Sequence, residues 1–199
     1  MALLTCDHPI VTGAVDLLLG SEEGNCSFGL WRDATEKELL IEAIFFAESI
    51  APTHLHADRF LPPTPICVVV NQEKERIFTD LPKLEGGSPR KLLENGKVRS
   101  QIIPAMLKAA QSFAEEDSQR LISEACKAMT LQMQTEIDRL VALREVNDHV
   151  RPQEIELAQG QLQQLEEVLE QARVRLDAIR LIWKGLPEDI GDEFSEFPH

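Results

Sequence analysis

Two histidines and an aspartate are the side chains of this sequence that best suit a metal ion. His54 and His56 are separated by one residue, and Asp58 follows at the same spacing. Alternate residues of an extended segment point to one side, so both imidazoles could bind one divalent metal. The third and fourth ligands of a complete site are missing and the histidines lie in a proline-flanked loop, so we expect a surface loop and no metal site. A small metal-dependent hydrolase is the least favoured alternative. Asp7 and His8 are weaker, since an aspartate before a helix-starting proline usually caps the helix.

Glutamates are abundant in the second half of the chain and could suggest a carboxylate metal cluster. Such clusters in helical bundles use Glu-x-x-His on inward faces. No histidine follows these glutamates at that spacing, and the inward stripes are apolar. We interpret them as solvated side chains: Glu115, Glu116, Glu124, Glu136, Glu154, Glu156, Glu166, Glu167 and Glu170.

The motifs of common catalytic sites are not found in the sequence. A phosphate-binding loop needs Gly-x-x-x-x-Gly-Lys-Ser/Thr, and the segment Leu84–Ser88 lacks the lysine. There is no Gly-x-Ser-x-Gly nucleophile elbow. We therefore expect this chain to be no enzyme, with no catalytic residue, no cofactor-binding residue and no cofactor of its own.

Composition excludes several classes of protein. The chain has 199 residues, 34 acidic and 20 basic side chains, and a formal net charge of −14. Phosphate groups repel such a chain, so direct nucleic-acid contact is not expected. The apolar runs are too short to cross a bilayer, and we see no secretion signal, so we expect a cytoplasmic protein without membrane contact.

The four cysteines have no Cys-x-x-Cys spacing, and we expect small buried or half-buried side chains at Cys6, Cys26, Cys67 and Cys126.

The first half of the chain, residues 1–96, is expected to be a sheet-containing α+β body. A proline start and helical spacing predict a helix over 8–19, while alternation and β-branched residues predict strands over 26–31 and 66–70. The run over 38–49 has helical propensity, but we predict a strand. One face of that strand would hold Ile41, Ala43, Phe45 and Ala47, which alternate with Glu42, Ile44, Phe46 and Glu48.

The second half, residues 97–179, is predicted to form a helical hairpin of the same domain, with helices at about 98–147 and 152–178. A strand over 179–184 would return to the sheet, and 185–199 would be an acidic, disordered tail. The fold class is thus α+β, a small and mostly antiparallel sheet with flanking helices and a long antiparallel coiled-coil-like hairpin. Its heptad seam contains Ile155, Ala158, Leu162, Leu165, Leu169, Ala172, Leu176 and Ile179.

The methionines and tryptophans are interpreted as core residues. Met129 and Met133 lie on the apolar stripe of the first long helix, and Trp31 and Trp183 each lie in a candidate strand. We therefore expect packing at these positions, not a binding surface.

Four segments of the sequence carry a resemblance to a known family: Asp7–Leu19, Arg59–Pro65, Arg139–Asn147 and Arg175–Ile182. In this order they resemble the C-terminal domain of the RapA (HepA) family, whose members are bacterial RNA polymerase-associated ATPases of the Swi/Snf type. The likeness runs from about Leu4 to Ile182, and the acidic tail departs from it. The proline-rich block and the last segment are the most specific.

The resemblance implies that this chain is the C-terminal portion of a larger protein. Family members bind RNA polymerase and use ATP hydrolysis to promote its recycling in transcription. Their ATP-binding, magnesium-dependent and DNA-binding motor lobes precede this region, and no family catalytic residue maps onto this chain. The resemblance thus implies a non-catalytic structural and interaction domain, with the hairpin bracing it against the motor lobes or the polymerase.

A second hypothesis comes from the heptad seam. If this seam paired between two chains, the protein would be a stand-alone coiled-coil partner-binding or dimerisation module. The short connection between the two helices favours pairing within one chain instead.

Overall fold

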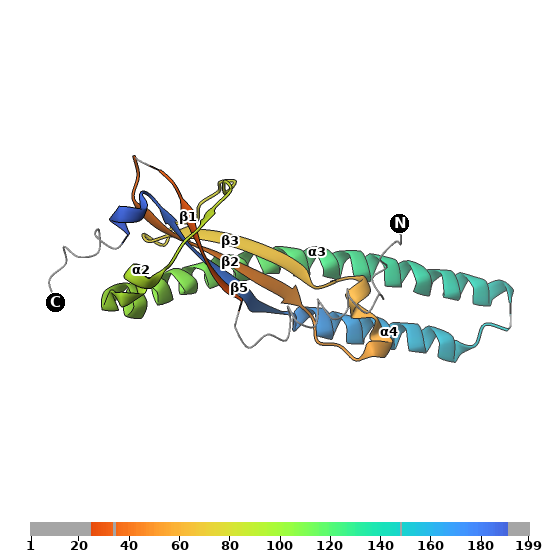
Figure 1. Cartoon of the computed structure of the whole chain (residues 1–199). Helices are drawn as coiled ribbons and strands as arrows, with labels where there is room; N and C mark the ends of the chain where they lie inside the picture. Colours follow the sequence, from red (N-terminus) through yellow and green to blue (C-terminus); the bar gives the residue numbers. More distant parts are fainter. Residues whose placement is uncertain (1–24, 34, 148, 191–199) are drawn as a thin grey trace, which may run out of the picture.

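This computed structural model describes residues 25–33, 35–147 and 149–190. They form a five-stranded sheet and a helical hairpin (Figure 1). The α+β prediction is confirmed. The helix predicted over 8–19, together with Cys6, lies outside the described residues.

The sheet is mixed, with strand order β3-β2-β5-β1-β4. Three neighbouring pairs are antiparallel, while β1 runs parallel to β5, from Cys26 opposite Ile179 to Trp31 opposite Lys184. The central strand β5 pairs with β2 and β1 on its two sides. The strands are β1 (Cys26–Trp31), β2 (Glu38–Glu48), β3 (Thr64–Asn71), β4 (Glu85–Gly86) and β5 (Arg173–Lys184).

The strand predicted over 38–49 is confirmed by the alternating burial of β2. Ile41, Ala43, Phe45 and Ala47 are all buried, and the residues between them are partly exposed. This period of two gives β2 a core face and an outer face, and burial of the core face outweighs the helical propensity of the run.

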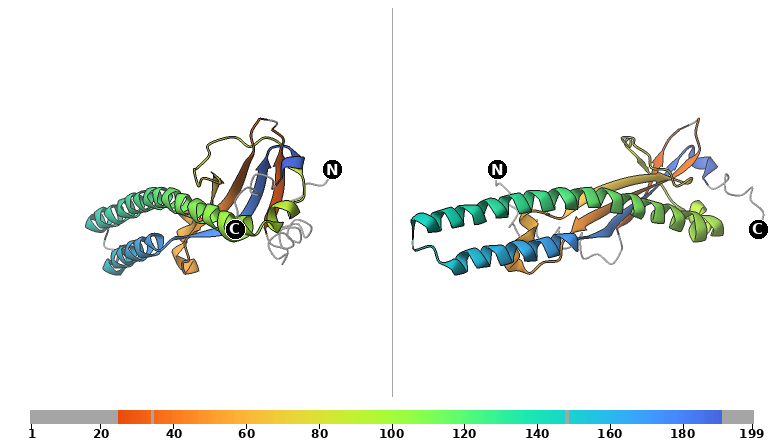
Figure 2. Two further views of the ribbon diagram at one scale, coloured as in Figure 1. Left: turned by 90° about the vertical axis from the view of Figure 1, so that its left-hand side faces the viewer. Right: turned by 180° about the vertical axis from the view of Figure 1, so that it is seen from behind.

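The long helix α3 (Ile103–Val146) covers the core face of the sheet along its first turns (Figure 2). Met106, Ala110 and Ala114 are fully buried there, in the main core with Trp183 of β5. A π-helical turn (Val98–Ile102) precedes α3, after the short helix α2 (Arg90–Glu94). Pro104 has no N–H to donate back to the preceding turn, which accounts for the irregular start of a helix predicted from 98.

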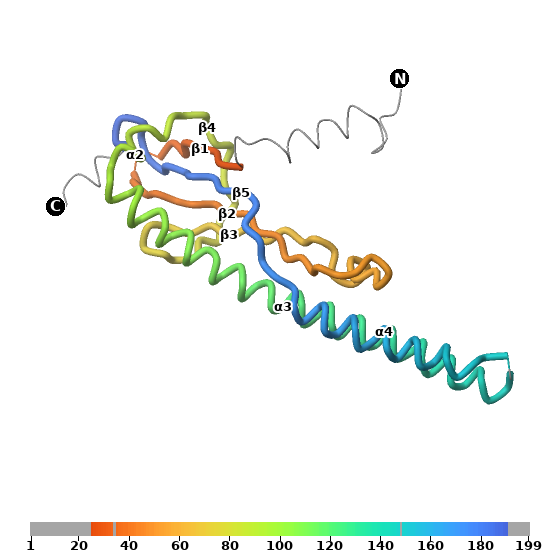
Figure 3. The backbone as a smooth tube through the Cα atoms, turned by 90° about the horizontal axis from the view of Figure 1, so that it is seen from below, coloured from red at the N-terminus to blue at the C-terminus, as the bar shows by residue number. Residues whose placement is uncertain are grey.

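The predicted hairpin is confirmed, and it extends away from the sheet (Figure 3). The return helix α4 (Pro152–Glu170) packs along α3, and Met129, Leu165 and Leu169 meet in a second core. Leu55 and Leu61 complete this core from a segment with two 3-10 turns (Thr53–Leu55 and Ala57–Arg59).

The return helix is shorter than the predicted 152–178, and the strand expected over 179–184 is longer. Helix α4 ends at Glu170, and β5 begins at Arg173. Charged Arg173 and Arg175 alternate with Val174 and Leu176, which also fits a strand, and pairing with β2 extends β5 to Arg173. The heptad pattern alone did not distinguish these outcomes.

The predicted disordered tail is wrong at its beginning. Residues Pro187–Asp189 form a 3-10 helix, and Ile190 is buried in the main core. The indole of Trp183 donates a hydrogen bond to the carbonyl of Leu186 (3.1 Å), which holds the chain against the sheet. Residues 191–199 lie outside the described residues.

The outer face of the sheet, opposite α3, is covered only in part. The segment before β4 packs Ile77, Leu81 and Leu84 onto a small cluster of Leu40, Val69 and Ile182. Trp31 lies half-buried beside that cluster, whereas Trp183 is fully buried, so the core interpretation holds fully only for Trp183.

Candidate functional site

The histidines predicted as metal candidates lie on the surface of the 3-10 segment. His54, His56 and Asp58 are exposed, and the intervening Leu55 and Ala57 are buried. Tight turns replace the extended segment that would have aligned the imidazoles. Over the described ranges, no three His, Cys, Asp or Glu side chains are grouped as a metal ion would need.

The glutamates of the hairpin point to solvent, as predicted. All nine are exposed except Glu166, which is half-buried and accepts a hydrogen bond from the Thr130 hydroxyl (3.3 Å). Met129 is fully buried and Met133 half-buried in the second core, so the core interpretation of both is confirmed.

Two cysteines are more exposed than predicted. Cys26 and Cys67 are exposed and Cys126 is half-buried. Cys67 lies on the outer face, where its thiol donates a hydrogen bond to Glu42 (3.5 Å). Partial burial, and then the negative charge of Glu42, raises the pKa of the Cys67 thiol. This thiol is therefore exposed but poorly ionised.

The basic side chains of the outer face are matched by acids. Arg180 Nη1 lies 3.2 Å from Glu42 Oε2, and Glu48 pairs with Arg173 (3.3 Å) and Arg175 (3.5 Å). These contacts cross from β5 to β2. Asp177 supplies a third carboxylate, 3.0 Å from Arg175, so the three arginines form a neutralised ladder of ion pairs. Such a ladder favours sheet pairing over capture of phosphate.

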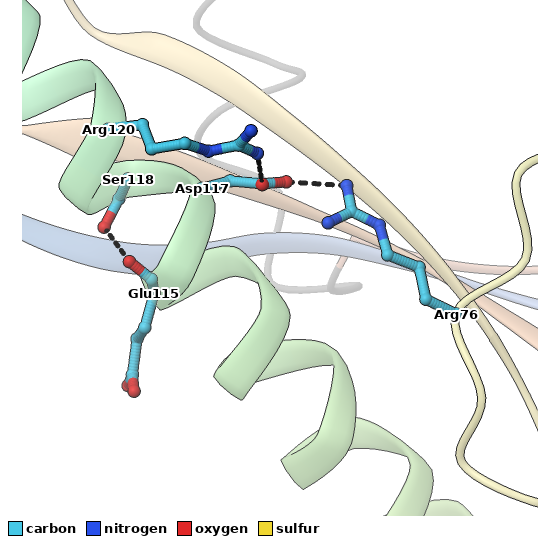
Figure 4. A network of polar contacts seen from close by, with 5 residues as sticks. All are labelled: Arg76, Glu115, Asp117, Ser118 and Arg120. Carbon is cyan, nitrogen blue, oxygen red and sulfur yellow. Dashed lines mark hydrogen bonds and ion pairs between the residues drawn. The ribbon is translucent and has the colours of Figure 1, made fainter.

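A different cluster lies where β3 meets α3, and we call it the Arg76 cluster (Figure 4). Arg76 Nη2 lies 2.6 Å from Asp117 Oδ2, and Arg120 pairs with the other oxygen of the same carboxylate. The hydrogen bond from Arg76, with that from Arg120, holds the pKa of Asp117 below its usual value. The cluster also contains two aromatic rings: Phe78 and Phe113.

Both aromatic rings flank the same guanidinium. The Arg76 guanidinium carbon is 4.8 Å from the ring centre of Phe78 and 5.9 Å from that of Phe113. Phe113 is half-buried, but Phe78 is 84% exposed. An exposed phenyl ring thus rests on a cation that is itself fixed by a largely buried carboxylate, an arrangement suited to contact with another molecule.

Next to the Arg76 cluster, a shallow cavity of about 340 Å³ lies between the edge of β3 and α3. Asp117 and Arg120 form part of its wall, opposite Pro65 and Cys67. A further open groove of about 710 Å³ runs between α3 and the start of β5, lined by Cys126, Glu170 and other residues of both polarities. Both are open surface depressions, and we attribute no reaction to them.

Sequence reasoning missed the Arg76 cluster. Arg76 and Asp117 are 41 residues apart, and no motif connects them. The one local indication is an aromatic residue, Phe78, two positions after the basic Arg76, and this pattern is too common to mark a site.

The chain matches the C-terminal region of the RNA polymerase recycling family (RapA_C) over residues 1–184. It is similar to RNA polymerase-associated protein RapA of Pectobacterium carotovorum, with 30% identity over 188 residues, covering 90% of this chain and 19% of the relative. For the RapA proteins of Serratia proteamaculans and Proteus mirabilis the identities are 33% over 185 and 31% over 188 residues, covering 88% and 90% of this chain and 19% of each relative. The chain therefore spans about a fifth of the length of these relatives.

Proposed function

The chain belongs to the C-terminal domain of the RNA polymerase recycling family, and from this premise we propose that it is a non-catalytic structural and interaction module of an RNA polymerase-associated protein. The family match over residues 1–184 carries this conclusion. RNA polymerase is the proposed partner, because the relatives are named for their association with it.

The catalytic work of the whole protein is assigned to the remaining four-fifths of the relatives' length. We propose that ATP hydrolysis, with its magnesium, and DNA binding belong to motor lobes there, as the family resemblance of the sequence implies. This chain would contribute no cofactor site. We expect the protein to be located in the cytoplasm, where transcription takes place in bacteria.

The shape of the hairpin supports a bracing role. Helix α3 has 44 residues and is about 66 Å long, far longer than the strands that it covers. Two separate cores, one under the sheet and one between the helices, hold this arm at a fixed angle. We propose that the arm braces the domain against the motor lobes of the same polypeptide.

Nucleic acid is not the proposed ligand of this domain. The arginines of β5 are paired with carboxylates of β2, and the whole chain has a net charge of −14. Phosphate binding would require the ion pairs of this ladder to break.

The dimerisation alternative is not favoured, because the heptad seam is already occupied. Leu165 and Leu169 of α4 are buried against Met129 of α3 in the same chain, and Ile155 packs against Ile137 nearer the end of the arm. A coiled coil between two chains would have to displace this packing.

Binding and turnover by the purified chain test the proposal. We expect it to bind purified bacterial RNA polymerase in a pull-down at physiological salt and to hydrolyse no ATP. A chain that does not bind the polymerase would contradict the proposed partner. ATP turnover that co-purifies with the chain through several columns would contradict the non-catalytic role.

A further inference from the structure

We propose that Phe78 and Arg120 are the anchor by which this domain docks on RNA polymerase, in an apolar pocket flanked by a carboxylate. The proposal rests on the proposed function for the identity of the partner. Its evidence is the geometry of the Arg76 cluster.

Phe78 has the highest exposed fraction of the large apolar side chains within the described ranges, at 84%. Single exposed apolar residues are common on protein surfaces and need no function. Phe78 differs because the chain beside it is held to β3 and its ring contacts a guanidinium. Ile77 beside it donates a backbone hydrogen bond to Val69 of β3 (2.8 Å) and packs in the small outer-face cluster.

The ring of Phe78 is supported from below. It rests 4.8 Å from the Arg76 guanidinium carbon, and Arg76 is fixed by Asp117 and by an isolated bridge to Val70. After Phe78, the chain is held again by Leu81 and Leu84 in the outer-face cluster. This cation–π contact restrains the ring, and a restrained ring loses less conformational entropy on binding than a free one, which favours its use as an interface anchor.

The charge beside the ring defines the chemistry of the partner. Arg76 and Arg120 share one carboxylate, that of Asp117, so their ion-pair network has an excess positive charge. The side chain of Arg76 is 20% exposed and that of Arg120 is 73% exposed. The excess charge is therefore accessible at Arg120, and a carboxylate on the partner would complement it.

A protein pocket fits this surface better than a nucleic acid does. Glu116 and Glu124 lie one helical turn before and after Arg120 and are exposed, so a phosphate backbone would meet their negative charge. A single carboxylate can pair with Arg120 alone, whereas a phosphate backbone has a charge at every nucleotide and would also have to pass Glu116 and Glu124; an apolar pocket beside that carboxylate would hold the ring.

Affinity measurements with the 199-residue chain and purified bacterial RNA polymerase test the anchor. We expect Phe78→Ala and Arg120→Glu each to weaken binding at least about tenfold. Phe78→Trp should keep most of the affinity, because it retains a flat ring on Arg76. The matched controls are Ile50→Ala, which removes an apolar side chain 68% exposed, and Arg139→Glu, which reverses a charge on the same helix that is 69% exposed.

The outcomes separate this inference from the proposed function. If the unchanged chain binds polymerase and both anchor variants bind equally well, the anchor is overturned and the proposed function stands. If the unchanged chain does not bind polymerase, both are overturned. Equal losses of polymerase affinity in the anchor and control variants would also overturn the anchor. The same holds if Phe78→Ala instead abolishes self-association of the chain or its binding to single-stranded RNA. Circular dichroism of each variant establishes that it is folded.

Discussion

Arg76 Nη2 donates to Asp117 Oδ2 at 2.6 Å, and this contact joins the segment that follows β3 to the first half of α3. The Arg76 side chain is 20% exposed and that of Asp117 is 14% exposed, so the pair is shielded from water. The contact therefore stabilises the fold. It also fixes the position of Arg76, on which the Phe78 ring rests at the surface.

Asp117→Asn should destabilise the chain by about 1–2 kcal/mol at pH 7, because it leaves a mostly buried guanidinium without its counter-charge. Urea unfolding followed by circular dichroism measures the loss. Asp138→Asn is the matched control, since Asp138 is exposed on the same helix and accepts a hydrogen bond from Gln134. A control that loses as much as Asp117→Asn would contradict the assignment.

The stability difference between the unchanged chain and Asp117→Asn should depend on pH. The folded pKa of Asp117 is lowered, so its stabilisation is complete above the unfolded pKa of about 3.9 and is lost as pH falls through the folded pKa. We therefore expect a constant difference from pH 7 down to about pH 5, and a smaller difference below pH 4. A difference that grows on acidification would show that another group dominates.

Met129→Ala should cost about 2–5 kcal/mol, because Met129 is fully buried between the two helices of the arm. Leu131→Ala, two residues further on and 72% exposed, should cost much less. The two midpoints of urea unfolding give the comparison. Equal costs would mean that the arm is not packed as a hairpin in solution.

Gly185→Ala should destabilise the chain by about 1–3 kcal/mol. Gly185 has a φ of +149°, and a Cβ there would lie 2.9 Å from Nε1 of Trp183, whose indole holds Leu186. Gly160→Ala in α4 meets nothing within 4 Å and should stabilise by about 0.4–1 kcal/mol. The midpoint temperature of thermal unfolding should thus fall in Gly185→Ala and rise in Gly160→Ala. A lower midpoint in both variants would contradict the prediction for Gly160.

The sequence allowed the elements to be predicted where one periodicity was clear. The alternation within 38–49 and the proline at 152 placed β2 and the start of α4 correctly. The end of α4 could not be placed, because residues 172–179 satisfy a heptad and an alternating pattern together. Only the pairing of β5 with β2, a contact between distant segments, decided between them.

The candidate site was less predictable than the fold. The Arg76 cluster depends on contacts between residues up to 41 positions apart, and neither Arg76 nor Asp117 is unusual locally. The sequence instead drew attention to His54 and His56, whose spacing would be effective only in an extended segment. The sequence shows which side chains could form ion pairs or bind a metal. It does not show which of them come close together, because tertiary packing sets those distances.

The pairing of Cys67 with Glu42 on the outer face leads to a last prediction, on thiol reactivity. Burial and Glu42 both raise the pKa of Cys67, so Glu42→Gln, which removes only the charge, should lower that pKa. Because the thiolate is the nucleophile, alkylation of Cys67 by iodoacetamide at pH 8 should become faster in this variant. Mass spectrometry of the Cys67 peptide, with the exposed Cys26 as internal reference, measures the ratio. Glu48→Gln is the control, since Glu48 pairs with Arg173 elsewhere on the same face; an equal effect there would assign the change to general loosening of the ladder.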